Sequence, residues 1–133
     1  MATNTHVHTN KVVTTSGTVG GDVSVTATGT GRVGVSESIA TATTNQLLTI
    51  AFPQTNLKSV VMYSDQAVTL SINGASDDTP DQTISLQAGK ALTWYTGGYF
   101  TVPLNQAVTS MYVTNVSGAT ANLEIEALYD GTP

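Results

Sequence analysis

The chain is built from short runs in which apolar residues occupy every second position, and this alternation limits the fold more than any other feature of the sequence. In residues 67–73 the apolar side chains are Val68, Leu70 and Ile72, with Thr and Ser between them. A two-residue period places successive side chains on opposite faces of an extended strand, so one face of each run is suited to burial. No segment keeps a 3.6-residue apolar period over three helical turns. The sequence therefore predicts an all-β protein.

Further runs of this kind predict strands that follow one another closely. The predicted strands cover residues 46–52, 57–63, 67–73, 83–87, 91–95, 108–114 and 121–129, and residues 115–118 are predicted to form a short hairpin loop. Strands at such spacing are typical of sandwiches and barrels. The short links favour antiparallel pairing, because a parallel crossover needs a dozen or more residues. With about eight strands in all, we expect an antiparallel β-sandwich of jelly-roll type.

The first third of the chain has a less regular pattern. Residues 1–10 are polar and without a period, which predicts a flexible tail or arm. Residues 22–28 alternate like a strand, but glycines divide this part of the chain into short pieces. It forms either a hairpin within the domain or an extended arm that lies on a neighbour. We expect one domain, with an N-terminal arm and the first strands in residues 1–45 and the sandwich core in residues 46–133.

Two segments share a construction. Residues 65–73 and residues 105–115 both start with a polar turn, continue with Gln-Ala-Val-Thr and end at Asn. Two strands of the same construction could occupy equivalent places in two sheets. The alternative is chance reuse of common strand residues.

The charge balance excludes several classes of partner. The chain has only four Lys and Arg residues, which are scattered, and a net charge of −5. Binding to nucleic acid or to an anionic membrane needs clustered cations, so neither partner is expected. No apolar run is long enough to span a membrane, and the N-terminus lacks the pattern of a signal peptide. We therefore expect synthesis in the cytoplasm without export by the general secretion route.

The surface composition is typical of a protein that is partly covered in an assembly. Charged residues make up 10% of the chain and Thr is the commonest residue. Short hydroxyl side chains keep a surface soluble, and they lose little conformational entropy when a neighbour covers them. A plain β-domain of mild composition is the alternative. The chain has no cysteine, which excludes a disulfide framework and a zinc–thiolate site.

Two clusters are weak candidates for metal binding. His6 and His8 are spaced so that both face one side of a strand, but they need a further ligand and lie in the polar tail, where solvated side chains are expected. Asp77, Asp78 and Asp81 lie in a loop whose spacing differs from that of an EF-hand, and such residues also build plain turns. We therefore predict no metal and no cofactor.

The sequence offers no convincing catalytic constellation, and we expect no enzyme activity. Glu124 and Glu126 lie on one face of the last predicted strand, which is typical of a solvated face that discourages edge-to-edge pairing. A Ser or Thr nucleophile usually needs a base, and the only His residues lie in the tail. Among the clustered aromatic residues we expect Trp94 to be buried. Tyr99 and Phe100 are either part of one end of the sandwich or exposed at a partner site.

The second half of the chain resembles small β-rich virion proteins of tailed bacteriophages. The residues that carry the resemblance are residues 64–70, Asn73 with the Asp/Pro loop, residues 82–94, residues 108–118 and residues 121–130. These motifs are strand and turn residues without a catalytic signature. They cover the chain from about residue 46 to the end, and the first third has no clear counterpart.

The resemblance implies a jelly-roll sandwich that is part of a virus particle. Members are typically proposed as capsid decoration or minor structural proteins, so we expect a protein of the virion, made in the host cytoplasm. Its expected partners are the major capsid protein or other virion proteins and further copies of itself, as a trimer. The alternatives are a phage tail or fibre component, or a carbohydrate- or host-recognition module that uses Tyr99 and Phe100.

Overall fold

The computed structural model describes residues 3–14 and 17–131, and the side chains among them except those of residues 10–23. These residues form ten β-strands and no helix, and every strand pair is antiparallel. The prediction of an all-β antiparallel protein is therefore confirmed. The described residues accordingly contain no helix that could cross a membrane.

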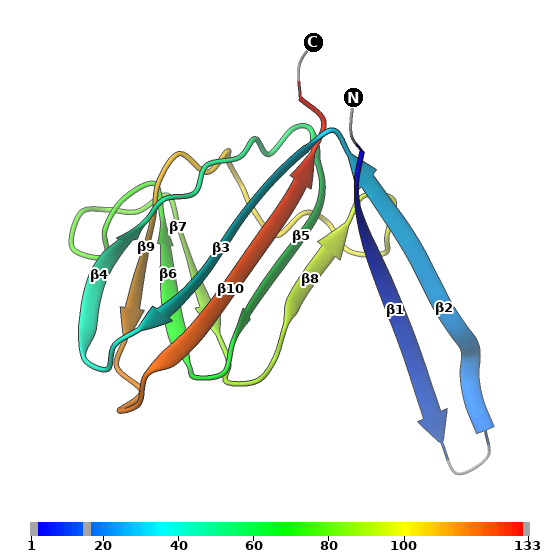
Figure 1. Cartoon of the computed structure of the whole chain (residues 1–133), viewed down its shortest axis with the longest axis horizontal. Coiled ribbons are helices and arrows are strands. Elements are labelled where there is room, and N and C mark those ends of the chain that lie inside the picture. Colours follow the sequence, from blue (N-terminus) through cyan, green and yellow to red (C-terminus); the bar gives the residue numbers. More distant parts are fainter. Residues whose placement is uncertain (1–2, 15–16, 132–133) are drawn as a thin grey trace.

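Eight strands form two four-stranded sheets (Figure 1). Sheet I contains, in spatial order, β3 (Gly31–Ile39), β10 (Ala121–Tyr129), β5 (Leu57–Ser64) and β8 (Leu92–Tyr95). Sheet II contains β4 (Thr43–Leu48), β9 (Met111–Asn115), β6 (Val68–Ile72) and β7 (Gln82–Leu86). The first of these eight strands pairs with the last, the second with the next to last, and so on inward. This nested order is that of a jelly roll, and it confirms the predicted sandwich.

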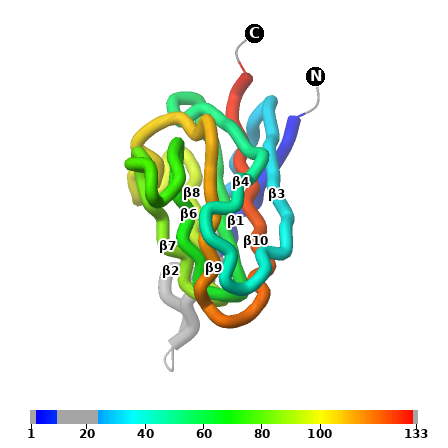
Figure 2. The backbone as a smooth tube through the Cα atoms, turned by 90° about the vertical axis from the view of Figure 1, so that its left-hand side faces the viewer, coloured from blue at the N-terminus to red at the C-terminus, as the bar shows by residue number. Residues whose placement is uncertain are grey.

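The first two strands form a separate hairpin. β1 (Asn4–Thr14) and β2 (Gly17–Gly29) make a two-stranded sheet that joins neither sheet of the sandwich. β1 begins, and β2 and β10 end, at the same end of the molecule (Figures 1 and 2). Residues 1–45 thus hold this hairpin, β3 and the start of β4. β1 and β2 are long strands, whereas the glycines in this part of the sequence indicated short pieces.

The core lies between the two sheets. On β10 the inward residues Leu123, Ile125 and Ala127 alternate with Glu124 and Glu126 on the outer face. Such alternation is what a sheet with one buried face requires. The neighbouring strand β5 adds the fully buried Met62. The facing sheet II supplies further fully buried side chains, among them Leu70, Ile72, Met111 and Val113.

The outer face of sheet I is an exception to this pattern, because part of it is covered. Leu128 and Ser59 are directly paired across β10 and β5, on the face that points away from the core. Both are nevertheless fully buried. The inner face of the hairpin, which includes His6 and its cross-strand partner Ala27, lies over this part of the sheet.

The structure rules out one of the two interpretations of the shared construction, and it corrects the predicted hairpin loop. The segments of shared construction, residues 65–73 and 105–115, form β6 and β9, which are hydrogen-bonded neighbours in one sheet rather than counterparts in two. Residues 115–118 do not close a hairpin, because β9 belongs to sheet II and β10 to sheet I. In a jelly roll, most consecutive strands alternate between the sheets, and a short loop is also long enough to cross from one sheet to the other.

Candidate functional site

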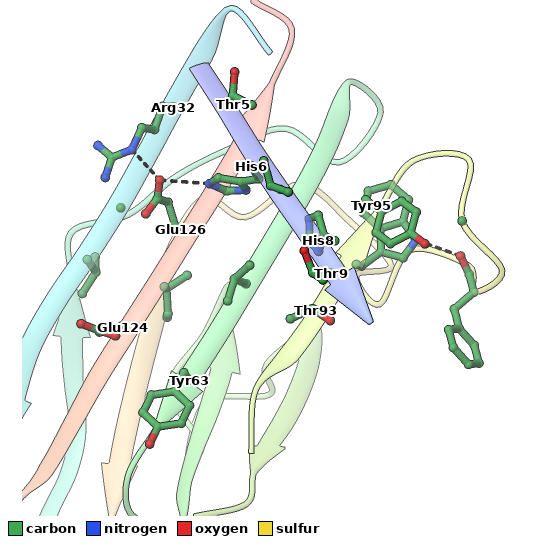
Figure 3. A pocket seen from close by; sticks show the side chains of 18 of the residues that line it. Thr5, His6, His8, Thr9, Arg32, Tyr63, Thr93, Tyr95, Glu124 and Glu126 are labelled. Atoms are coloured by element: carbon green, nitrogen blue, oxygen red, sulfur yellow. Dashed lines mark hydrogen bonds and ion pairs between the residues drawn. The ribbon is translucent and has the colours of Figure 1, made fainter. Parts of the chain in front are cut away.

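A groove of about 1250 Å³ lies between the hairpin and the outer face of sheet I (Figure 3). Its hairpin side is formed by residues 5–9 of β1. Its floor is formed by outward side chains of the four strands of sheet I, and the loop that follows β8 adds Tyr99 and Phe100. Both His residues and three of the charged residues discussed below, Arg32, Glu124 and Glu126, line this groove.

Two histidines on β1 reach down to one hydroxyl group on β5. Alternation along the strand puts His6 and His8 on the same face, toward sheet I. Nδ1 of His6 lies 2.8 Å from Oγ of Ser59, and Nε2 of His8 lies 2.7 Å from the same oxygen. The prediction that these histidines lie in a solvated tail is therefore wrong. Residues 4–9 are part of a paired strand, and pairing with β2 holds both imidazoles on the sheet.

Glu126 on β10 completes this contact. Its Oε1 lies 3.0 Å from Nε2 of His6 and 2.6 Å from Nε of Arg32 on β3. These two hydrogen bonds, above all that from Arg32, lower the pKa of Glu126 below its usual value although partial burial opposes the shift. Glu126 is therefore ionised at neutral pH and acts only as an acceptor.

The positions of the protons follow from this acceptor. Nε2 of His6 must carry a proton to bond the Glu126 carboxylate, so Nδ1 of a neutral His6 accepts the hydroxyl proton of Ser59. Ser59 has only one proton to donate, and His8 must therefore donate its Nε2–H to the Ser59 oxygen. We call His6, His8, Ser59 and Glu126 the histidine latch, because they join the hairpin to sheet I.

The pKa of His8 is lowered from its usual value, first by burial and then by repulsion from His6. The ring of His8 also packs at 4.8 Å from the ring of Tyr95 on β8. His8 is thus held neutral at ordinary pH in a half-buried site, and protonation would place a second positive charge beside His6 when that residue is also charged.

The order Ser59–His6–Glu126 has the connectivity of a nucleophile, a base and an orienting carboxylate. Geometry argues against that use. Ser59 is 0% exposed, so in this structure a substrate carbonyl cannot approach its hydroxyl group. Moving the hairpin aside would uncover Ser59, but it would also remove the histidine that acts as base. The arrangement is suited to holding two elements together.

The acidic residues of the loop after β6 are not gathered into a ligand set. Among the described residues no group of three or more His, Asp or Glu side chains could hold a metal ion, and this applies to the histidine pair as well as to the loop. Asp81 accepts a hydrogen bond from the side-chain amide of Asn73, and the backbone N–H of Asp78 closes a turn on Ala75. These are contacts of a plain loop between β6 and β7.

Tyr99 and Phe100 are exposed on the rim of the groove. Their exposed fractions are 95% and 77%, and their rings pack edge to face with centroids 5.4 Å apart. The indole N–H of Trp94, which is half-buried and packs against the core, donates to the carbonyl oxygen of Phe100 and holds this loop. Of the two alternatives for this pair, exposure is the one that the structure shows.

The sequence singles out His6 and His8 as a pair, but it assigns Glu126 to a solvated strand face and gives no indication of Ser59, of Arg32 or of the contacts among these residues. A serine on a strand is ordinary, and nothing in its neighbours distinguishes Ser59. One signal was present. Leu128 interrupts the alternation of β10 with an apolar residue on the outer face, which indicates that something covers that face.

Comparisons with known proteins do not assign the chain to a family. No family model and no curated protein matches the chain. A solved structure described as "Bacillus endospore appendages form a novel family of disulfide-linked pili" matches 74% of this chain and 87% of its own, with 12% identity and a TM-score of 0.38. A likeness at that level does not bear on function.

Proposed function

We propose that this chain is a non-enzymatic structural protein of a tailed-bacteriophage particle, and that it decorates the surface of the capsid. The hairpin would be the arm that joins it to a neighbour. Its partners would be the major capsid protein or other virion proteins and further copies of the chain, in a trimer. It would be made in the host cytoplasm and then built into the virion, without contact to nucleic acid or membrane.

The observation that carries this proposal is that, among the residues that the structure describes, the outer edges of the hairpin do not pair with either sheet of the sandwich. In the described part of the chain β1 and β2 pair only with each other. An isolated two-stranded ribbon is marginally stable in water, and the free edges of strands are templates for strands of another chain. A ribbon whose strands have 11 and 13 residues is therefore suited to engage a partner. The low share of charged residues in the chain, 10%, fits a surface that such a partner covers.

The first test is the composition of the particle. Mass spectrometry of virions purified from the source culture should detect this chain at a copy number comparable with that of the major capsid protein. A copy number that is a small fraction of this value would favour a tail or fibre component. Absence of the chain from purified virions would contradict the proposal.

The second test asks whether the hairpin carries the attachment. Thr9 and Ser24 are paired across the hairpin, so residues 10–23 can be replaced by an Asn-Gly turn that keeps the histidine latch. We expect this variant to stay folded but to lose co-sedimentation with capsids stripped of the chain, as a deletion of residues 1–30 should. Full retention of binding by both variants would exclude the hairpin as the arm.

A second candidate function is recognition of a host carbohydrate. The observation in its favour is the exposed pair Tyr99 and Phe100 on the rim of a groove that also offers the carboxylate of Glu124. Exposed aromatic rings beside polar groups are common in binding sites. A glycan array, with and without Ca²⁺, should show binding that Tyr99→Ala and Phe100→Ala abolish. Absence of binding on the array would remove this candidate.

A further inference from the structure

The link between the hairpin and the sandwich is one residue long. β2 ends at Gly29 and β3 begins at Gly31, so Thr30 alone reverses the chain. Oγ1 of Thr30 accepts a hydrogen bond of 2.8 Å from the backbone N–H of Gly131. A Cβ on Gly29 would lie 2.8 Å from the carbonyl oxygen of Tyr129. This one-residue hinge at Thr30 thus packs against the end of β10, and its backbone has little freedom to change conformation.

The surface that receives the hairpin is built for this particular segment. Ser59 and Leu128 are fully buried on an outer face, and Ser59 is satisfied by both imidazoles of β1. Glu126 also uses the hairpin as a partner, through His6. Without the hairpin this face would expose an apolar side chain and leave the hydroxyl of Ser59 without its imidazole partners. The occupant that fits this face is therefore residues 4–9 and 24–29 of this chain.

We propose that the hairpin is exchanged between copies, so that β1–β2 of one copy docks on the outer face of sheet I of a second copy and the exchange closes into an oligomer. Each docking site then keeps the contacts of the histidine latch, and only the path of the chain at Thr30 changes. Exchange of an identical element is a low-cost route to oligomers, and a short, constrained hinge favours it. Opening the reversal at Thr30 lets β2 lead away from β3 toward the second copy.

This inference rests on the proposed function for where the oligomer would work, but its test needs only the purified chain. A negative result here therefore leaves the virion composition test intact, and absence from virions would not decide whether hairpins exchange.

The experiment varies the hinge length and measures molar mass by size-exclusion chromatography with light scattering over a range of protein concentrations. We expect the unmodified chain to form a closed oligomer of two or three copies in equilibrium with monomer. Insertion of Gly-Ser-Gly after Thr30 should let the hairpin dock on its own copy more easily. It should therefore raise the midpoint of dissociation, which is the protein concentration at which half of the oligomer has dissociated, by about tenfold or more. Deletion of Thr30 should prevent docking on the same copy and shift the chain wholly to the oligomer.

The matched control carries the same Gly-Ser-Gly insertion after Asp77, in the exposed loop between β6 and β7, and should behave like the unmodified chain. Equal masses and midpoints for the unmodified chain and the Thr30 insertion variant would overturn the proposal, because association would then use another surface. If the deletion variant fails to fold, the comparison of the insertion after Thr30 with the insertion after Asp77 still tests the proposal. A chain that stays monomeric at every concentration would also overturn it.

Discussion

Nε2 of His8 lies 2.7 Å from Oγ of Ser59, although the two residues are 51 positions apart in the sequence. This contact joins the N-terminal hairpin to a sandwich that is otherwise complete without it. Because Ser59 is fully buried and its hydroxyl also bonds to His6, this one small polar group contributes to holding both imidazoles of the hairpin on sheet I.

Replacing that group should weaken the docking. Ser59→Ala leaves the half-buried imidazoles without their shared partner, which should lower the free energy of unfolding by about 1–3 kcal/mol. Chemical denaturation measures this change. Ser36→Ala is the matched control, because Ser36 is an exposed residue on the outer face of the same sheet. Equal stabilities of the two variants would mean that the hydroxyl of Ser59 does not support the hairpin.

Acid should loosen the hairpin before it unfolds the sandwich. The pKa of His8 is lowered by burial and by His6, so the docked state binds fewer protons than the undocked state. The stability of docking therefore falls as the pH drops through about 6.5, the unperturbed value for histidine, and continues to fall until the pH is below the lowered pKa. Besides His6, the groups that contact His8 are Ser59 and Tyr95. Glu126 contacts His6, and Arg32 contacts Glu126. The side chains of β2 that the structure describes, those of residues 24–29, carry no charge.

Hydrogen exchange of the β1 amides, expressed as protection factors between pH 7.5 and 5, measures this dependence. Glu126 contributes in a separate window, because its lowered pKa means that its stabilisation is lost only as the pH falls below its usual value of about 4.5. His8→Gln should make protection between pH 7.5 and 5 less dependent on pH. An unchanged profile in this variant would show that His8 is not the titrating group.

The burial of Leu128 depends on the hairpin. Leu128→Ala should cost about 2–5 kcal/mol in the full chain, as buried leucines typically do. In a chain that lacks residues 1–30 the same substitution should cost much less, because Leu128 would then face water on the outer side of sheet I. Chemical denaturation measures both losses of unfolding free energy. Equal losses in the full chain and in the shortened chain would mean that the hairpin is not what buries Leu128.

The backbone of Gly29, next to the hinge at Thr30, lies too close to the backbone of Tyr129 for a larger residue. In Gly29→Ala the added Cβ would lie 2.8 Å from a backbone carbonyl oxygen of Tyr129, which cannot move without shifting β10. We expect a loss of about 1–3 kcal/mol from this overpacking. For Gly34→Ala the nearest atom is at 3.3 Å, so a smaller loss is expected. Thermal unfolding of the two variants side by side compares them, and the reverse order would contradict the packing at the hinge.

Much of the sandwich could be predicted from alternation alone. Residues 67–73, 83–87 and 121–129 form β6, β7 and β10 within a residue or two, because one-sided burial imposes a two-residue period. The nested pairing could not be read in the same way. Residues 115–118 have the composition of a hairpin loop, and only the three-dimensional pairing shows that they connect two sheets.

The candidate site was only partly predictable, since its residues come from four distant segments. His6 and His8 were identified as a pair, but the pattern of residues 1–10 does not indicate a strand. What holds this segment in place is pairing with β2 and the hydroxyl of Ser59, about fifty residues away in the sequence. Only the interrupted alternation at Leu128 indicated in advance that the outer face of sheet I is covered.

The most direct test of the histidine latch is NMR spectroscopy of the imidazole nitrogens at neutral pH, because the chain contains only two histidines. The latch predicts that both His6 and His8 are Nε2–H tautomers, and that Nδ1 of His6 shows the shift of an acceptor bonded to Ser59. Two averaged spectra typical of free, solvent-exposed imidazole would contradict the latch and return these residues to a solvated tail.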